Sequence, residues 1–172
     1  RRKRALRDGA NQRAVKSYTT ERLRDEFLIS NLDVPDTVVA VNSDVDRMVT
    51  LGCMPVEKTV SIERGIDCWR NFGTDYFLER REIGIFNIGG DGVITADGVE
   101  YRLGYKDCLY ITKGTREVFF KSCEKERPAK FYMVSAPAHT AYETKLLTIK
   151  DAVKRQLGDG ASSTPRVHNP CT

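Results

Sequence analysis

Histidine is scarce in this sequence: only His139 and His168 occur among 172 residues. Two imidazoles are too few for a metal centre that needs about three of them with a carboxylate. The five cysteines are scattered and form no CxxC pair. This pattern argues against a disulfide framework and a zinc knuckle, and it is typical of a reducing compartment. No metal ligands are therefore predicted in this chain.

Long apolar runs are also missing. No stretch of about 18 apolar residues is present, which excludes a membrane-spanning helix. The basic N-terminus is not followed by the apolar segment of a secretory signal. We therefore expect a cytoplasmic protein without a membrane partner.

Positive charge is concentrated at one end. Residues 1–16 contain seven Lys or Arg against Asp8 alone, a balance of +6, whereas the whole chain carries +4. The rest is therefore net negative and shows no basic face with interleaved aromatics, so no nucleic-acid partner is predicted. We interpret residues 1–17 as a disordered, solvated basic tail; a DNA-binding arm or a targeting remnant are the alternatives.

Short β-branched segments separated by Gly, Pro, Asn and Asp dominate the middle of the chain. Their spacing of roughly 8–12 residues predicts an all-β sandwich or barrel. Asp97-Gly98 is a strong hairpin signal, because both residues tolerate positive φ. The expected strands are 37–41, 47–51, 58–62, 76–88 (broken near Gly84), 92–95, 99–103, 108–112, 117–121 and 130–135.

Two short helices are predicted to flank the strands. The first covers Thr19 to Leu28, with a threonine cap and Leu23 and Phe27 on one face. The second begins at Thr148, where Thr148-Ile149-Lys150-Asp151 resembles a capping box, and ends at Gly158. Trp69 is interpreted as a packing residue.

The glycines of residues 86–120 admit two interpretations. A phosphate-binding loop would need GxGxxG or GxxxxGK[ST] spacing followed by a helix, and Gly89-Gly90-Asp91-Gly92 has neither. We therefore interpret these glycines as turns between strands, at positions where positive φ favours glycine. The predicted turn glycines are Gly90, Gly92, Gly98, Gly104 and Gly114.

The spacing resembles that of cupins, which are double-stranded β-helix (jelly-roll) barrels. Glu82 is followed by six residues and Gly89, as at the end of the first cupin motif, and Gly114 matches a glycine of the second. Thr112, Lys106 and Glu117 stand where that second motif has proline, glycine and histidine. The resemblance implies an all-β cupin barrel with short flanking helices whose metal-binding histidines are missing.

Four residues are candidate substrate-binding groups. One placement of Glu82 and Glu117 is inside the barrel, where unpaired carboxylates are costly to bury. Nearby arginines, Arg80, Arg81 or Arg116, would neutralise them. The carboxylates then belong either to a structural ion-pair network or a solvated rim, or to a polar pocket for a sugar acid. His139 is either a structural histidine or a ligand contact. The candidates are therefore Arg81, Glu82, Glu117 and His139; catalytic residues are not assigned.

Longer strings extend the resemblance to one enzyme family. The sequence is similar to the N-terminal half of the 4-deoxy-L-threo-5-hexosulose-uronate (5-keto-4-deoxyuronate) ketol-isomerases over about residues 18–160. The strings that resemble it are LRDEFLI (23–29), DRMVTLGCMPVEKTV (46–60), YFLERREIGIFNIGGDGVITADG (76–98), KDCLYITKGTREVFF (106–120) and PAKFYMVSAPAHTAYETK (128–145).

The family resemblance implies a cytoplasmic, oligomeric bicupin of pectin degradation. Its members interconvert 5-dehydro-4-deoxy-D-glucuronate and 3-deoxy-D-glycero-2,5-hexodiulosonate, with zinc held by histidines and a glutamate of a second cupin domain. We expect a degenerate cupin domain at 18–147, and a helix with a linker or aberrant tail at 148–172.

On this interpretation the zinc-binding domain is absent, and the chain is a fragment or frameshifted copy that is inactive alone. The alternative is a non-catalytic cupin that binds a sugar acid or serves as an oligomerisation scaffold.

Overall fold

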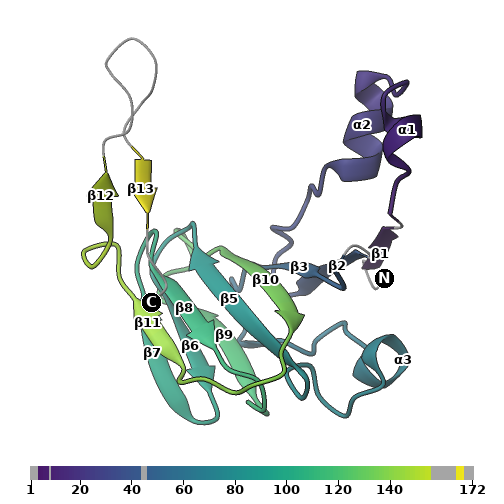
Figure 1. The fold of residues 1–172 in the computed structure, drawn as a ribbon. Coiled ribbons are helices and arrows are strands. Elements are labelled where there is room, and N and C mark those ends of the chain that lie inside the picture. The colour runs from purple at the N-terminus through teal and green to yellow at the C-terminus, as the bar shows by residue number, and fades with distance from the viewer. Residues whose placement is uncertain (1–3, 8, 44–45, 156–165, 169–172) are drawn as a thin grey trace.

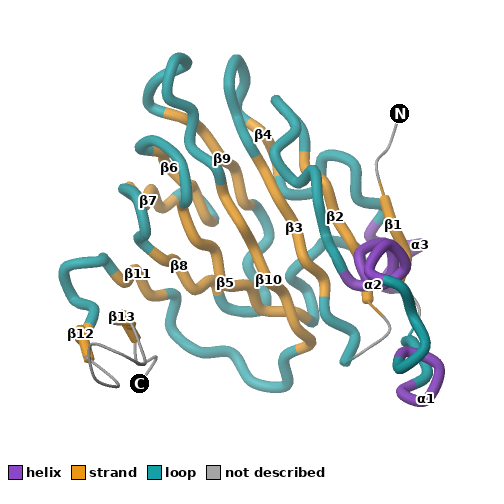
Figure 2. The backbone as a smooth tube through the Cα atoms, turned by 90° about the horizontal axis from the view of Figure 1, so that it is seen from above, coloured by secondary structure: helices purple, strands orange, loops and turns teal. Residues whose placement is uncertain are grey.

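The computed structural model describes residues 4–7, 9–43, 46–155 and 166–168. Most of the described strands belong to a seven-stranded sheet and a four-stranded sheet (Figures 1 and 2). The seven-stranded sheet runs β1 (Arg4–Arg7), β2 (Val38–Ser43), β3 (Val49–Cys53), β10 (Phe131–Pro137), β5 (Arg81–Asn87), β8 (Cys108–Ile111) and β11 (Lys145–Leu147). The four-stranded sheet runs β4 (Val60–Ser61), β9 (Val118–Ser122), β6 (Gly92–Ala96) and β7 (Val99–Leu103).

All neighbouring strands of these two sheets are antiparallel except β1 and β2, which are parallel. A separate antiparallel pair joins β12 (Val153–Arg155) and β13 (Arg166–His168). The prediction of an all-β, cupin-like fold is therefore confirmed.

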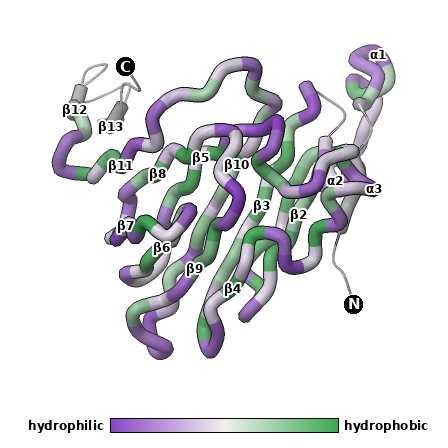
Figure 3. The backbone as a smooth tube through the Cα atoms, turned by 90° about the horizontal axis from the view of Figure 1, so that it is seen from below, coloured by the Kyte–Doolittle hydropathy of each residue, from purple (hydrophilic) through white to green (hydrophobic). Residues whose placement is uncertain are grey.

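One hydrophobic core lies between the two sheets. Phe120 on β9 and Phe131 on β10 are fully buried, and their ring centroids are 5.3 Å apart across the sheets. Alternation along β5 turns Ile83 and Ile85 into this core, as expected for a strand with one buried face. Figure 3 shows the same pattern, with hydrophobic colour along the strands and hydrophilic colour at many turns.

Three short helices accompany the sheets: α1 (Gln12–Val15), α2 (Thr20–Phe27) and α3 (Cys68–Phe72). The predicted helix after Thr19 is confirmed as α2, because the Thr19 hydroxyl accepts a hydrogen bond from the Arg22 amide at 3.3 Å. Helix α2 buries none of its residues and lies to one side of the sheets (Figure 1). Within the described ranges, no helix has the length and apolar character needed to cross a membrane.

Several expectations for individual segments are wrong. Strand β5 passes through Gly84 without a break, since Gly84 pairs with Tyr110 and Val134 on its two sides. Trp69 is not a packing residue, because it is 74% exposed.

The helix predicted from Thr148 does not form over the described residues. The Asp151 carboxylate accepts hydrogen bonds from the amide and hydroxyl of Thr148, which closes one turn, and the chain then enters β12. The expected end of that helix, at 156–158, lies outside the described residues.

Two short elements are described within residues 1–17. Arg4–Arg7 form β1 beside β2, and Gln12–Val15 form α1 with Asn11 as its cap. Residues 1–3 and 8 lie outside the described ranges. The edge of β2 offers unpaired backbone groups, which explains why the basic segment takes up a strand there.

The predicted turn glycines differ in what requires glycine: positive φ at some positions, close packing at others. The Asp97-Gly98 turn has positive φ at both residues (45° and 82°), so this hairpin prediction is confirmed. Gly90 does not adopt positive φ; an added Cβ would lie 2.0 Å from the carbonyl oxygen of Arg127. Of the five predicted turn glycines, only Gly98 and Gly114 have positive φ.

Candidate functional site

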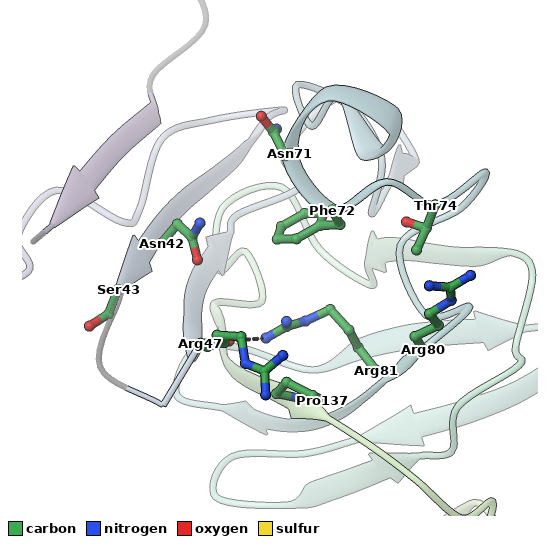
Figure 4. A pocket seen from close by; sticks show the side chains of 9 residues that line it. All are labelled: Asn42, Ser43, Arg47, Asn71, Phe72, Thr74, Arg80, Arg81 and Pro137. Carbon is green, nitrogen blue, oxygen red and sulfur yellow. Dashed lines mark hydrogen bonds between the residues drawn. The ribbon is translucent and has the colours of Figure 1, made fainter.

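A cavity of about 330 Å³ opens at one end of the seven-stranded sheet (Figure 4). It lies among the end of β2, the β2–β3 connection, α3 with the loop that follows it, the start of β5 and the end of β10. The residues that line it are Asn42, Ser43, Arg47, Asn71, Phe72, Thr74, Arg80, Arg81 and Pro137. We call this cavity the arginine pocket.

Arg81 is the buried cation of the arginine pocket. It is 6% exposed, because the alternation of β5 turns it to the same side as Ile83 and Ile85. Its Nε donates to the Ser135 hydroxyl at 3.1 Å, and its Nη2 donates to the carbonyl oxygens of Ser135 and Arg47 at 2.8 and 2.7 Å. These acceptors are all neutral, and no carboxylate among the described residues forms an ion pair with Arg81.

The surroundings of Arg81 disfavour its positive charge. Burial, followed by repulsion from Arg47, lowers the pKa of Arg81 to about 10. Its guanidinium carbon lies 5.3 Å from the centroid of the Phe72 ring, a distance at which a cation and an aromatic face attract each other. At neutral pH Arg81 therefore remains charged in a pocket without a described counter-ion.

Arg47 and Arg80 complete the basic lining. Figure 4 shows the side chains of Arg47 and Arg81 approaching each other below Phe72, with Arg80 on the other side below Thr74. Arg80 is exposed and contacts the Glu79 carboxylate at 3.9 Å. The described lining thus combines three arginines with no carboxylate.

Glu82 lies on the opposite face of β5 from Arg81. It is half-buried, and its carboxylate accepts a hydrogen bond from the Tyr110 hydroxyl at 2.7 Å. Burial, together with this contact, raises the pKa of Tyr110 to about 12, so the phenol stays protonated. Glu82 therefore does not share the inward-facing side of β5 with Arg81, since consecutive strand residues face opposite sides.

Glu117 is exposed and lies in a second cavity of about 510 Å³. Four carboxylates and one arginine line it, together with Tyr76: Glu63, Asp75, Asp97, Glu117 and Arg116. Arg116 stacks on the Tyr76 ring, 5.1 Å from its centroid, and forms no ion pair with Glu117 among the described contacts. This acidic cavity repels a sugar acid.

His139 is exposed in the connection after β10, where its carbonyl oxygen accepts a hydrogen bond from Lys113 Nζ at 3.2 Å. The structure therefore places Arg81 in the arginine pocket but Glu82 and Glu117 elsewhere, and His139 lines neither cavity. The predicted neutralisation of Glu82 and Glu117 by Arg80, Arg81 or Arg116 is wrong for the described ion pairs. Sequence reasoning missed Arg47, Asn71 and Thr74.

The zinc implied by the family resemblance does not fit the residues described here. Among them, no group of three or more His, Cys, Asp or Glu side chains is placed to hold a metal ion. Glu82 and Glu117 occupy cupin motif positions, but the first is bonded to Tyr110 and the second is exposed. No chemical step through zinc can be derived from this chain.

Comparison with known proteins identifies the family. The profile of the KduI/IolB family matches residues 67–172, more than half of the chain. The chain belongs to the KduI/IolB family. Within the KduI/IolB match lie α3 and the whole four-stranded sheet except β4. Six of the residues that line the arginine pocket also lie within it: Asn71, Phe72, Thr74, Arg80, Arg81 and Pro137.

Curated relatives in the KduI/IolB family cover nearly all of the chain. Proteins named 4-deoxy-L-threo-5-hexosulose-uronate ketol-isomerase are 47% identical over 167 residues in Lachnospira eligens and 49% identical over 155 residues in Yersinia enterocolitica. These matches cover 95% and 90% of this chain, but 58% and 55% of the relatives. The chain therefore spans little more than half the length of the curated relatives it matches.

Solved structures give more distant matches. A putative glyoxylate-induced protein from Pseudomonas aeruginosa superposes with a TM-score of 0.46 at 11% identity, covering 66% of this chain and 39% of that one. A cupin protein from Bacteroides fragilis superposes with a TM-score of 0.39 at 18% identity, covering 64% of this chain and 79% of that one.

Proposed function

We propose that this chain works as part of a ketol-isomerase that interconverts 5-dehydro-4-deoxy-D-glucuronate and 3-deoxy-D-glycero-2,5-hexodiulosonate in pectin degradation. The observation that supports the proposal is 47% identity, over 95% of the chain, to a relative named for this type of activity. The substrate is then a small acidic sugar.

Within such an enzyme we propose a supporting role for this chain. Ketose–aldose isomerisation moves a proton between adjacent carbons, so it needs a base and an electrophile that stabilises the developing oxyanion. A zinc ion supplies that electrophile when bound. The carboxylates of Glu82 and Glu117 lie apart from the arginine pocket. We therefore place the catalytic groups in the portion of the longer relatives that this chain does not match.

Location and assembly belong to the same proposal. Within the described part of the chain, Cys53, Cys68 and Cys123 are free thiols, as is typical of a cytoplasmic enzyme. We propose a homo-oligomer without nucleic-acid or membrane partners. Large exposed apolar side chains, such as Phe27 on α2 and Trp69 on α3, support a role in assembly.

An isomerase assay tests the proposal. We expect the 172-residue chain with zinc to turn over 5-dehydro-4-deoxy-D-glucuronate at least about 1,000-fold more slowly than the full-length Lachnospira eligens relative. A chimera in which this chain replaces the matching portion of that relative should recover activity to within about tenfold, measured by following substrate and product by NMR.

The controls separate the two parts of the proposal. Turnover by the chain alone near that of the relative would overturn the supporting role. A chimera that folds and assembles like the relative yet remains inactive would overturn the proposed reaction.

A further inference from the structure

The arginine pocket contains an uncompensated buried cation. Elsewhere in the described chain, exposed arginines lie near carboxylates: Arg22 is 4.0 Å from Glu26, and Arg102 is 3.6 Å from Asp91. Arg81 is 6% exposed and hydrogen-bonds only to neutral oxygens of Ser135 and Arg47. A buried charge is costly unless an opposite charge accompanies it. The pocket therefore favours an anion.

The geometry of Arg81 leaves room for that anion. Its three hydrogen bonds use Nε and Nη2, and a guanidinium carries two further N–H donors on Nη1. Arg47 contributes its carbonyl oxygen to Arg81, so its own guanidinium is not required for that bond. Both guanidinium groups line the same cavity (Figure 4). A planar carboxylate matches such paired donors.

Two polar side-chain atoms of the pocket lining indicate that the ligand carries hydroxyl groups. The side-chain oxygens of Asn71 and Thr74 are buried and have no hydrogen-bond partner among the described residues. Thr74 is 3% exposed, and both residues line the arginine pocket. A buried polar atom without a partner is rare in native proteins, because it costs about 1–3 kcal/mol. The amide oxygen of Asn71 accepts a hydrogen bond, and the hydroxyl of Thr74 can donate or accept one.

We propose that the arginine pocket binds a small hydroxy acid, with its carboxylate on Arg81 and Arg47 and its hydroxyl groups on Thr74 and Asn71. The cavity of about 330 Å³ is at the lower end of ligand-site volumes, which suits a single sugar-sized molecule. The choice of a sugar acid among hydroxy acids rests on the proposed function, whereas the binding of a hydroxylated carboxylate does not.

The test is titration calorimetry of the 172-residue chain at pH 7 and low salt. The probes are D-galacturonate, the neutral sugar D-galactose and inorganic phosphate. We expect D-galacturonate to bind at least about tenfold more tightly than D-galactose, because the neutral sugar lacks the charged group. D-Galacturonate should also bind more tightly than phosphate, which cannot use Thr74 and Asn71 in the same way.

Substitutions then locate the site. Arg47→Gln should weaken D-galacturonate binding about tenfold, and Thr74→Val should weaken it by a similar factor. Arg47→Gln removes only a side-chain charge, since the bond to Arg81 uses the main-chain carbonyl. Lys121→Gln is the matched control: it removes one positive charge from an exposed position on β9, outside the pocket lining. Arg81→Gln is informative only if its thermal melt matches the wild type.

Three results would overturn the proposal. They are no binding of D-galacturonate by the wild type, equal binding by the Arg47→Gln and Lys121→Gln variants, or equal affinity for phosphate with no effect of Thr74→Val. Binding measured on this chain is separate from turnover. An inactive chimera together with intact D-galacturonate binding would overturn the proposed reaction while supporting the pocket.

Discussion

The Asp36 carboxylate holds one backbone turn in place through three hydrogen bonds. Its Oδ1 accepts hydrogen bonds from the backbone amides of Val56, Glu57 and Lys58 at 2.8, 2.9 and 3.1 Å. These contacts, the Val56 bond foremost, lower the pKa of Asp36 below its usual value. The carboxylate therefore fixes the turn between β3 and β4 from twenty residues away.

Asp36 should contribute to the pH dependence of stability. A lowered pKa in the folded state means that the stabilisation is present above the unfolded value of about 3.9 and is lost as pH falls through the folded value. In urea unfolding at pH 7, we expect Asp36→Asn to be less stable by about 1–2 kcal/mol. Its stability should also fall less steeply than the wild type below about pH 4.

The control for Asp36 is Glu124→Gln, which alters an exposed carboxylate and should leave both quantities nearly unchanged. If the stability of the wild type and of Asp36→Asn fell equally steeply with pH below about pH 4, Asp36 would not contribute to the acid dependence of stability.

Among the pocket residues, only the arginines after Glu79 were signalled by sequence. Arg80 and Arg81 were named because they lie next to Glu82 in sequence and could neutralise it. Arg47, Asn71 and Thr74 were not singled out, because only the fold brings the β2–β3 connection next to α3 and the loop that follows it. Glu82 was misplaced because motif spacing does not determine which face of a strand a residue occupies.

At the scale of elements, the connection between β5 and β6 depends on close packing. Asn87 is fully buried; its Nδ2 donates to the carbonyl oxygens of Gly90 and Leu103 at 2.8 and 3.0 Å. Its Oδ1 accepts from the Gly89 amide at 3.1 Å. Gly90 lies so near Arg127 that a side chain has no space.

Two alanine substitutions separate packing from intrinsic backbone preference. Gly90→Ala should destabilise the protein by at least about 2 kcal/mol, because Cβ would meet the Arg127 carbonyl oxygen at 2.0 Å. Gly84→Ala on β5 should be neutral or stabilising by up to about 1 kcal/mol, since no atom lies within 4 Å of the added Cβ. Urea unfolding of both variants provides the measurement. Similar effects at the two positions would contradict the packing explanation.

Secondary structure was predicted correctly where a few neighbouring residues are enough to determine it. The Asp97-Gly98 hairpin requires only two residues with positive φ and paired flanking strands. The Thr148–Asp151 motif also forms its hydrogen bonds, but in a single turn. The same four residues can form a turn or start a helix, and here the chain continues into Val153–Arg155, which pair with Arg166–His168.

For the whole molecule, stability is expected to come from the core between the sheets. Phe120→Ala should lower the free energy of unfolding by about 3–5 kcal/mol, because it opens a cavity beside Phe131. Phe86→Ala, on the exposed face of β5, is the matched control and should cost less than about 1 kcal/mol. The two variants are compared by urea unfolding. Equal losses would show that the outer face is also buried, for example by assembly.

The fold class was predictable from turn spacing and family resemblance, whereas the strand order was not. Strand β10 lies between β3 and β5, and β9 lies between β4 and β6. Such pairings join segments that are distant in sequence, so they depend on which faces bury the most apolar area rather than on any local pattern.

The parallel pairing of β1 with β2 also bears on the solubility of the protein. Arg4–Arg7 align with Ala40, Val41, Asn42 and Ser43, and thereby occupy the outer edge of β2. An uncovered strand edge is a template on which other chains can add as further strands. A chain shortened by these four residues would present the apolar strand β2 as such a template. We therefore expect the N-terminal strand to limit such pairing, and its short, arginine-flanked sequence makes it a poor template itself.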